Sequence, residues 1–499
     1  MDRIPAPPDT VAALLDPAST GPALVTVTGE TLDHAALRAA VDRLAERLRQ
    51  AGLGPGDRIA IVLPNGPEMA LVLLAAMSVG CAAPLNPKYR EEEFRFYLDD
   101  LRAAALVTDG GAPAAEAAVP EATRVIAVQG ARLTIDLIVD GGPAGNAAAE
   151  PPVAADEALV LHTSGTTSRP KIVPLRQRNL AWSARNIAAS LSLGSTDRSL
   201  TVMPLFHIHG IMAGLLAPLS AGGAVVCTPG FDGFKFHRWL DGLAPTYYTA
   251  VPTMHQMVLA RAPERRPTSL RFVRSSSASL PRPVMEGLSE LFGVPVVEAY
   301  GMTEASHQMT CNPLPPGVVK PGSVGVAAGI EVTILDGANN ELPPGQRGEV
   351  AIRGATVVDG YENNPDANAA AFTAGWFRTG DEGMLDDEGY LFLTGRLKEQ
   401  INRGGEKISP LEVDEVLLRH PAVAEAVTFA IPHDKLGEEV GAAVVLVPGE
   451  TVTEAELRRY VREQLAPFKV PKQIVFLTEV PKGATGKLQR IGLAERLSL

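Results

Sequence analysis

Apolar positions in the first hundred residues follow helical and strand-like spacings in turn. Between residues 31 and 50 they recur at every third or fourth position, which predicts one amphipathic helix with Thr31 as its N-cap and Gly52 past its end. The continuous apolar run 58–63 predicts a buried strand. A second helix from Met69 and a following strand complete a βαβ-like pattern, which predicts an α/β fold.

The same alternation continues along the chain. The run 158–161 predicts a buried strand, and 179–191 and 454–465 have helical spacing. A short strand is predicted at 200–203. Residues 109–156 are rich in Ala, Gly and Pro, which is typical of connections and short strands.

Length and composition restrict the class of protein. At 499 residues the chain is too long for one core, so a large domain and at least one smaller domain are expected. Hydrophobic residues at 46% and charged residues at 20% are ordinary for a soluble globular protein. The net charge of −12 argues against nucleic acid or an anionic membrane as a partner. Anionic substrates must therefore be bound by local positive charge.

Cysteines and terminal segments indicate a cytoplasmic location. Cys81, Cys227 and Cys311 are odd in number and lack ligand spacing, so neither a disulfide framework nor a zinc site is expected. The N-terminus has no apolar signal core, and the final LSL is not the peroxisomal SKL signal. The longest apolar run, 69–85, falls short of the roughly 20 residues of a membrane span.

A turn dense in hydroxyl groups follows the strand predicted at 158–161. From Thr163 to Lys171 it reads TSGTTSRPK, which offers five hydroxyls, backbone N–H groups and a lysine charge within nine residues. That combination suits polyphosphate. The spacing is not that of the Walker loop, because no second glycine precedes Lys171 and no Ser or Thr follows it. A polar surface turn is the alternative reading of such a composition.

This stretch resembles the nucleotide loop of the adenylate-forming superfamily, which comprises acyl-CoA synthetases, adenylation modules of peptide synthetases and beetle luciferases. Ser168 stands where the superfamily usually has glycine. The resemblance implies that one group of loop residues binds the phosphates of ATP, namely Thr163, Ser164, Gly165, Thr166, Thr167 and Lys171.

Two further motifs resemble the nucleotide site of that superfamily. The run VVEAYGMTE matches its Y-G-x-T-E motif, which implies that Tyr300 stacks on adenine, Thr303 contacts the α-phosphate and Glu304 holds Mg²⁺. Magnesium prefers one or two carboxylates together with phosphate oxygens, which agrees with that role. WFRTGD places Asp381 where the superfamily has the aspartate that accepts both ribose hydroxyls, although Thr-Gly-Asp alone is an ordinary turn.

The stretch 391–410 resembles the hinge of the superfamily. By this match Arg396 contacts the ribose or a phosphate, and Lys398 is the hinge residue. Gly404 and Gly405 would let pantetheine run close to the backbone, because no Cβ stands in the way. A basic, solvated loop is the alternative.

PKGATGKLQR, near the C-terminus, places Lys487 at the position of the catalytic lysine, although composition alone indicates a flexible tail. The resemblance covers nearly the whole chain. It implies an α/β fold with a large N-terminal domain, residues 1–396, of stacked α/β subdomains and a small β-barrel. A small mobile C-terminal α+β domain, residues 397–499, would rotate at Lys398.

The implied chemistry has two halves. First, a small carboxylic acid attacks the α-phosphate of ATP, with Mg²⁺ and Lys487 neutralising charge, and forms an acyl-adenylate and pyrophosphate. The C-terminal domain then turns, and the thiol of coenzyme A attacks the acyl carbon with AMP as the leaving group. No nucleic-acid partner and no membrane span are expected.

Three other classes share these motifs. A stand-alone adenylation enzyme would load a carrier protein, which the absence of a carrier domain before Leu499 disfavours. A luciferase-like oxygenase has no separate sign in the sequence. A catalytically dead relative is disfavoured because Glu304, Asp381, Arg396 and Lys487 are all present.

The segments that the superfamily uses around the acyl group are polar in this chain. They are 205–211, 249–256, 271–280 and 300–309, and they hold four of the nine histidines. A fatty-acyl tunnel needs apolar walls, because each buried CH₂ contributes roughly 0.8 kcal/mol and unpaired polar groups oppose burial. A second carboxylate, by contrast, is bound by donors such as His and Ser.

The runs SRPK, RSSSASL and TEASHQMTCNPLPPG resemble oxalate–CoA ligases more closely than fatty-acyl or coumaroyl ligases. Oxalate is therefore the expected acid, with His207, Ser277 and His307 binding it. A short- or medium-chain fatty-acyl or aryl-CoA ligase is the alternative, in which the histidines only cap strands around an apolar pocket. A metal at His207 and His209 is disfavoured because no third ligand with recognisable spacing accompanies them.

Overall fold

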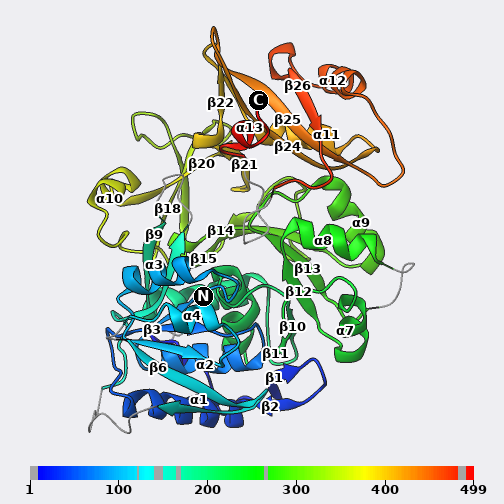
Figure 1. The fold of residues 1–499 in the computed structure, drawn as a ribbon. Helices are drawn as coiled ribbons and strands as arrows, with labels where there is room; N and C mark the ends of the chain where they lie inside the picture. Colours follow the sequence, from blue (N-terminus) through cyan, green and yellow to red (C-terminus); the bar gives the residue numbers. More distant parts are fainter. Residues whose placement is uncertain (1–8, 121–122, 140–149, 164–169, 263–267, 482–489) are drawn as a thin grey trace.

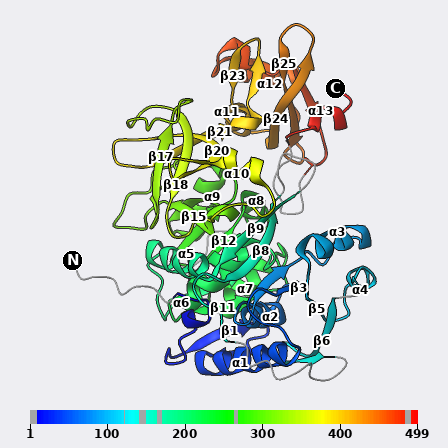
Figure 2. The same ribbon diagram turned by 90° about the vertical axis from the view of Figure 1, so that its left-hand side faces the viewer.

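The computed structural model of the chain contains four β-sheets with helices between and around them (Figures 1 and 2). It describes residues 9–120, 123–139, 150–163, 170–262, 268–481 and 490–499. Two large sheets form the lower part in Figure 1, a third sheet lies above them, and the fourth belongs to the C-terminal domain at the top.

The first large sheet has seven strands in the order β7-β6-β5-β3-β4-β8-β9. Its central strands are parallel, and β7 and β9 are antiparallel to their neighbours. Its strands and the helices between them are β3 (Arg58–Val62), α2 (Pro67–Met77), β4 (Cys81–Pro84), α3 (Glu91–Leu101), β5 (Ala105–Thr108), α4 (Pro113–Ala117), β6 (Arg124–Ala131), β7 (Thr134–Val139), β8 (Glu157–Thr163) and β9 (Lys171–Arg176). The predicted βαβ pattern is confirmed.

The second large sheet has nine strands in the order β16-β15-β14-β13-β12-β10-β11-β1-β2. Six neighbouring strands, from β14 to β1, run parallel. Its elements are β1 (Pro22–Thr26), β2 (Thr31–Asp33), β10 (Arg198–Thr201), the π-helix η2 (Gly210–Leu216), α6 (Ala217–Ser220), β11 (Ala224–Cys227), α7 (Phe236–Leu243), β12 (Tyr247–Ala250), α8 (Pro252–Ala260), β13 (Phe272–Ser276), α9 (Arg282–Phe292), β14 (Val296–Met302), the 3₁₀-helix η3 (Thr303–Ala305), β15 (His307–Cys311) and β16 (Val326–Ala327).

Helices packed between these sheets form the main core. Every residue of α2 is buried except Glu68, and the helix contacts β3, β4 and β8 on one side and β1 on the other. This explains the unbroken apolar run in the sequence, because a helix covered on both sides has no polar face. Helices α1 (His34–Gln50) and α5 (Gln177–Ser190) pack in the same layer.

The start of α1 differs from the prediction. Residues 31–33 form β2, which pairs antiparallel with β1, and Asp33 is the N-cap, accepting a hydrogen bond from the backbone of Ala36 at 2.7 Å. Thr31 is therefore a strand residue, because pairing with β1 satisfies the backbone that a helix would otherwise use. The three cysteines are free and buried.

The expected small barrel is an open sheet in the described residues. The order is β17-β18-β20-β19, with β21 also paired to β20. The long strand β20 pairs with β19 near its start and with β21 near its end, so the edge strand β17 has no strand to close against. The elements are β17 (Glu331–Leu335), β18 (Gly348–Arg353), α10 (Pro365–Ala371), β19 (Phe372–Thr373), β20 (Trp376–Leu385) and β21 (Leu391–Arg396).

The C-terminal domain has its own sheet, β23-β22-β25-β24 with β26 beside β25, and its own apolar clusters. The large α/β domain and the smaller α+β domain confirm the predicted fold class. The elements are the 3₁₀-helix η4 (Leu397–Glu399), β22 (Ile401–Arg403), β23 (Glu406–Ile408), α11 (Pro410–Leu418), β24 (Val423–His433), β25 (Gly437–Leu446), α12 (Glu454–Arg462), β26 (Gln473–Phe476) and α13 (Leu493–Arg496). Among the described residues, no helix is long and apolar enough to span a membrane.

Gly325 is required where β16 meets β15. Its φ is +85°, and an added Cβ would lie 1.9 Å from the carbonyl carbon of Cys311. Gly345 has nearly the same φ, +83°, but an added Cβ there meets nothing within 4 Å. Substitution at Gly345 would therefore add only backbone strain, whereas substitution at Gly325 would add backbone strain and a steric clash.

We expect Gly345→Ala to lower the free energy of unfolding by about 1 kcal/mol, because only the left-handed backbone is penalised. Gly325→Ala should lower it by roughly 3 kcal/mol, because β16 must also move away from β15. Urea unfolding of both variants checks this. Equal losses would contradict the clash at Gly325.

Candidate active site

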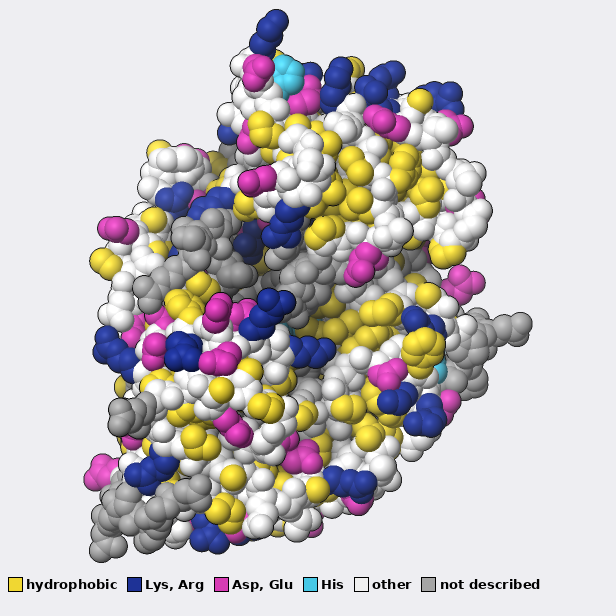
Figure 3. All heavy atoms as spheres, in the orientation of Figure 1, with side chains coloured by type: hydrophobic (Ala, Val, Ile, Leu, Met, Phe, Trp, Pro, Cys, Tyr) yellow, Lys and Arg dark blue, Asp and Glu magenta, His cyan; other side chains and the backbone are white. Residues whose placement is uncertain are grey.

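The candidate residues gather where the parallel strands of the nine-stranded sheet end. In open α/β sheets, ligands bind outside the carboxyl ends of the strands. Thr249 lies near the end of β12, Ser277 directly follows β13, and Tyr300 lies near the end of β14. In Figure 3 the surface is hollowed where the C-terminal domain meets the large domain, and Lys and Arg side chains gather around this hollow.

The predicted phosphate loop connects two antiparallel strands. Thr163 ends β8 and is paired with Lys171, the first residue of β9. The Nζ atom of Lys171 lies 4.2 Å from the ring centroid of Tyr361. Burial lowers the pKa of Lys171, the charge of Lys398 lowers it further, and Glu304 opposes both effects. Lys171, Glu304 and Lys398, which are distant in sequence, therefore share one electrostatic environment.

Several predicted residues lie outside the described residues. They are Ser164, Gly165, Thr166 and Thr167 of the loop, and Lys487 near the C-terminus. Their assigned roles stay predictions.

The residues predicted to bind the nucleoside form a connected group. The hydroxyl of Tyr300 donates to the Oδ2 atom of Asp381, and the Oδ1 atom of Asp381 lies 2.9 Å from the Nε atom of Arg396. Asp381 and Arg396 are opposite each other on β20 and β21. The charge of Asp381 holds the pKa of Arg396 above its ordinary value. The pKa of Tyr300 is also raised, first by burial and then by the charge of Asp381. The third sheet thus brings a carboxylate and a guanidinium to the end of β14.

Glu304 fits the role of a magnesium ligand. It is 7% exposed, and its Oε1 atom accepts a hydrogen bond from the hydroxyl of Tyr361 at 2.8 Å. Thr303 precedes it on η3. Among the described residues no cluster of three His, Cys, Asp or Glu side chains is placed to hold a metal. A single carboxylate suits Mg²⁺ because this ion keeps waters and takes phosphate oxygens.

A buried polar cluster lies at the acyl side of the site. The guanidinium of Arg274 lies 3.3 Å from the Nε2 atom of His209 and 3.2 Å from the Nε2 atom of His307. The two imidazole rings stack, with centroids 4.8 Å apart. The Nδ1 atom of His209 lies 3.1 Å from the Oγ atom of Ser277. The structure therefore brings together two predicted substrate residues, Ser277 and His307, through two that were not assigned a role.

The backbone is strained around this cluster. Ser277, Ser306 and His307 have φ values of +75°, +53° and +95°, although none is glycine. Left-handed conformations of such residues are concentrated at functional sites, where the surrounding structure enforces them. His209 directly precedes the π-helix η2, another feature that is frequent at functional sites.

His207 takes a different position from the other predicted substrate residues. Its ring is half-buried and lies 4.6 Å from the ring of Phe206, measured between centroids. The role predicted for His207 stays a prediction. His209 is the histidine of this segment that contacts Ser277 and Arg274.

Arg274 lies in 271–280, one of the polar segments expected around the acyl group, but no role was predicted for it. Its sequence signal is one arginine within the strand FVRSS, at a position that the alternation along β13 directs to the same side as Phe272. That signal is weak, because an isolated arginine in a strand pattern more often marks an edge facing solvent.

Gly404 and Gly405 lie away from this group. They form the turn of the β22–β23 hairpin, with φ values of +60° and +99°, and the hairpin lies at the outer end of the C-terminal domain (Figures 1 and 2). Two successive positive φ values explain why both residues are glycine. Contact of this turn with a ligand at Tyr300 requires another domain orientation.

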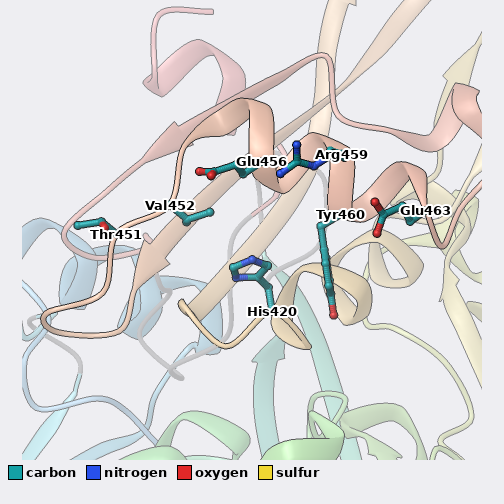
Figure 4. A pocket seen from close by; sticks show the side chains of 7 residues that line it. All are labelled: His420, Thr451, Val452, Glu456, Arg459, Tyr460 and Glu463. Carbon is teal, nitrogen blue, oxygen red and sulfur yellow. The ribbon is translucent and has the colours of Figure 1, made fainter.

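A separate hollow of about 380 Å³ lies on the C-terminal domain, beside α12 (Figure 4). The ring of His420 packs edge-on against Tyr460, with centroids 4.9 Å apart. Glu456, Arg459 and Glu463 bring charges of both signs to its rim. None of the residues predicted from the sequence lies there.

The sequence matches two family models, the AMP-binding enzyme family over residues 16–362 and the AMP-binding enzyme C-terminal domain over residues 412–487. The chain therefore belongs to the AMP-binding enzyme family, which confirms the predicted superfamily. It is 47% identical to an oxalate–CoA ligase of Arabidopsis thaliana, over 93% of this chain and 94% of the relative. It is 43% identical to an oxalate–CoA ligase of Saccharomyces cerevisiae, over 88% of this chain and 86% of the relative. The ATP-bound crystal structure of MatB from Rhodopseudomonas palustris superposes with a TM-score of 0.87, at 30% identity over 98% of both chains.

We expect Asp381→Asn to weaken ATP binding by about 10- to 100-fold, because hydrogen bonds to a charged group contribute roughly 1.5–3 kcal/mol. Isothermal titration with ATP measures the change. Asp386→Asn is the matched control, since Asp386 lies just beyond the end of β20 and pairs with Lys320 instead. Equal ATP affinity in wild type and Asp381→Asn would contradict the assignment.

Proposed function

We propose that this protein is an ATP-dependent oxalate–CoA ligase, which forms oxalyl-adenylate and then oxalyl-CoA with release of pyrophosphate and AMP. One observation carries the proposal: the acyl side of the site is a buried, positively charged cluster of Arg274, His209, His307 and Ser277. Such a cluster disfavours the binding of an alkyl chain and favours the binding of a second carboxylate. The two oxalate–CoA ligases that resemble this chain support the same substrate.

In the first half-reaction, a carboxylate oxygen of the acid attacks the α-phosphate of ATP. Because a carboxylate is a weak nucleophile, the enzyme accelerates this step by positioning the reactants and neutralising their charge. Tyr300, Asp381 and Arg396 would hold the nucleoside, and Lys171 with the loop hydroxyls would bind the phosphates. Thr303 and Lys487 would contact the α-phosphate. Glu304 would hold Mg²⁺, which neutralises phosphate charge when bound.

In the second half-reaction, the thiol of coenzyme A attacks the acyl carbon, and AMP leaves. The turn at Gly404 and Gly405 lies at the outer end of the C-terminal domain. It would reach the adenylate only after rotation at Lys398, which lies in η4, between the third sheet and β22. The boundary between residues 396 and 397 supports this hinge, because β21 ends at Arg396 and the C-terminal sheet begins at Ile401.

The test of the proposal is pyrophosphate release across a panel of acids with ATP and Mg²⁺. We expect oxalate to react faster than acetate, octanoate and coumarate. His307→Ala should raise the KM for oxalate or lower kcat, because it removes a donor from the acyl side. His433→Ala is the control, since His433 is exposed at the far end of β24. A preference for octanoate would refute oxalate and leave the ligase reaction standing.

A second experiment tests the role of Lys487. Lys487→Ala should abolish most adenylation, because its ammonium group is needed while two negative groups approach each other. Thioester formation from preformed oxalyl-adenylate and coenzyme A should persist. The two half-reactions are measured separately, by pyrophosphate release and by thioester formation. Equal loss in both would refute the assignment.

A further inference from the structure

Arg274 is a fully buried cation without an acidic partner among the described residues. It is 0% exposed, in register with Thr249 on β12 and Val297 on β14. Its guanidinium donates to Thr249 Oγ1 at 3.0 Å and to Gln308 Oε1 at 3.0 Å, besides its contacts to the two histidines. All four partners offer neutral acceptors, so its charge is not balanced within the described structure.

Contact with arginine determines the tautomer of both histidines. A guanidinium only donates, so the Nε2 atoms of His209 and His307 must accept. The hydroxyl of Thr249 agrees with this assignment, because its oxygen accepts a hydrogen bond from Arg274 and its proton is donated to the Nε2 atom of His209, 2.6 Å away. Both rings are therefore neutral, with their proton on Nδ1.

Each Nδ1–H then directs a donor toward the site. His209 donates to Ser277 Oγ, so the hydroxyl proton of Ser277 is available to another acceptor. The Nδ1 atom of His307 faces Gly301, since a Cβ built at Gly301 would lie 3.2 Å from it. Gly301 follows Tyr300 on β14, so this donor lies next to the nucleoside group.

We propose that Arg274 is a positioning residue that makes the enzyme select acids with a second carboxylate. It orients Ser277 and His307 as donors through the two histidines, and its charge attracts the carboxylate that does not react. This inference rests on the proposed function and deepens it. The guanidinium suits this role because two acceptors on two rings need two N–H groups in one plane, whereas a lysine ammonium keeps the charge without that planar arrangement.

Neighbouring titratable groups do not neutralise Arg274. Burial lowers the pKa of Arg274, and Cys311 and Tyr247 oppose this effect. Burial raises the pKa of both Cys311 and Tyr247, so these two groups stay uncharged near neutral pH. A buried charge without a partner is unfavourable for folding. A substrate carboxylate would supply the opposite charge, which explains why a buried Arg274 lies at the substrate side of the sheet.

The test compares oxalate with oxamate, an isostere in which a neutral amide replaces one carboxylate. In Arg274→Met, kcat/KM for oxalate should fall on the order of 100-fold, mainly through KM, because a buried charged partner is lost. The kcat/KM for oxamate and the KM for ATP should both change little. Arg274→Lys, which keeps the charge, should retain part of the preference for oxalate.

Arg282→Met is the matched control, because it removes the same charge from an exposed position on α9. It should leave both substrates unaffected. If Arg274→Met lowers activity toward oxalate and oxamate by the same factor, the residue has only a structural role and the inference is overturned. The same conclusion follows if Arg274→Lys behaves like Arg274→Met.

A second readout does not depend on the substrate. Nitrogen-15 NMR of the free enzyme, with resonances assigned through His209→Asn and His307→Asn, should show both rings as neutral Nδ1–H tautomers. Arg274→Met should release this restriction. An Nε2–H tautomer at either ring in wild type would overturn the inference. If the wild-type enzyme turns over another acid and not oxalate, the proposed function is refuted. The NMR tautomers of His209 and His307 still test whether Arg274 positions the two rings.

Discussion

The carboxylate of Asp381 connects the parts of the molecule that must meet at the nucleoside. It is 5% exposed and bound on one side by Tyr300 from the nine-stranded sheet, and on the other by Arg396 from β21. A buried charge that loses one partner is strongly destabilised. This contact therefore helps to position the third sheet on the second, together with the hydrogen bonds from Tyr361 to Glu304 and from Ser306 to Thr356. Because β21 leads directly into η4, the contact also sets where the C-terminal domain starts.

The acyl side of the site concentrates features that are unfavourable for folding. Buried Arg274 lacks an acidic partner in the described part of the chain, and its Nε atom, like the hydroxyls of Ser275 and Ser276, has no hydrogen-bond partner there. His307 and Ser277 have left-handed backbones. Elsewhere the same sheets pack against apolar clusters. Such an accumulation at one place is typical of a site retained for binding rather than for stability.

Charge also links the phosphate loop to the predicted hinge. Burial lowers the pKa of Lys171, the charge of Lys398 lowers it further, and Glu304 opposes both effects. Two cations beside one carboxylate form an arrangement that polyanionic phosphates would stabilise. In this orientation Lys398 therefore belongs to the electrostatics of the site as well as to the connection between the domains.

Local sequence determined much of the fold and most of the nucleotide side. Local periodicity predicts the apolar spacing of α1 and α5, the apolar run of β3 and the almost completely apolar α2. Tyr300, Glu304, Asp381 and Arg396 were predicted because they belong to short motifs that resemble the nucleotide site of the adenylate-forming superfamily. These signals are contained within a few consecutive positions, so no knowledge of the packing is needed to find them.

Tertiary structure decided what depends on contacts between distant segments. The open third sheet follows from the pairing of β20 with two strands on one side, and the N-cap at Asp33 follows from the pairing of β2 with β1. The Arg274 cluster joins β13 to the residue before η2, to β12 and to β15, and the partners of Arg274 are 25 to 65 positions away from it in sequence. A lone arginine or histidine in sequence has no partner that periodicity can reveal, because only the pairing of β12 to β15 and the packing of η2 place their side chains within hydrogen-bonding distance.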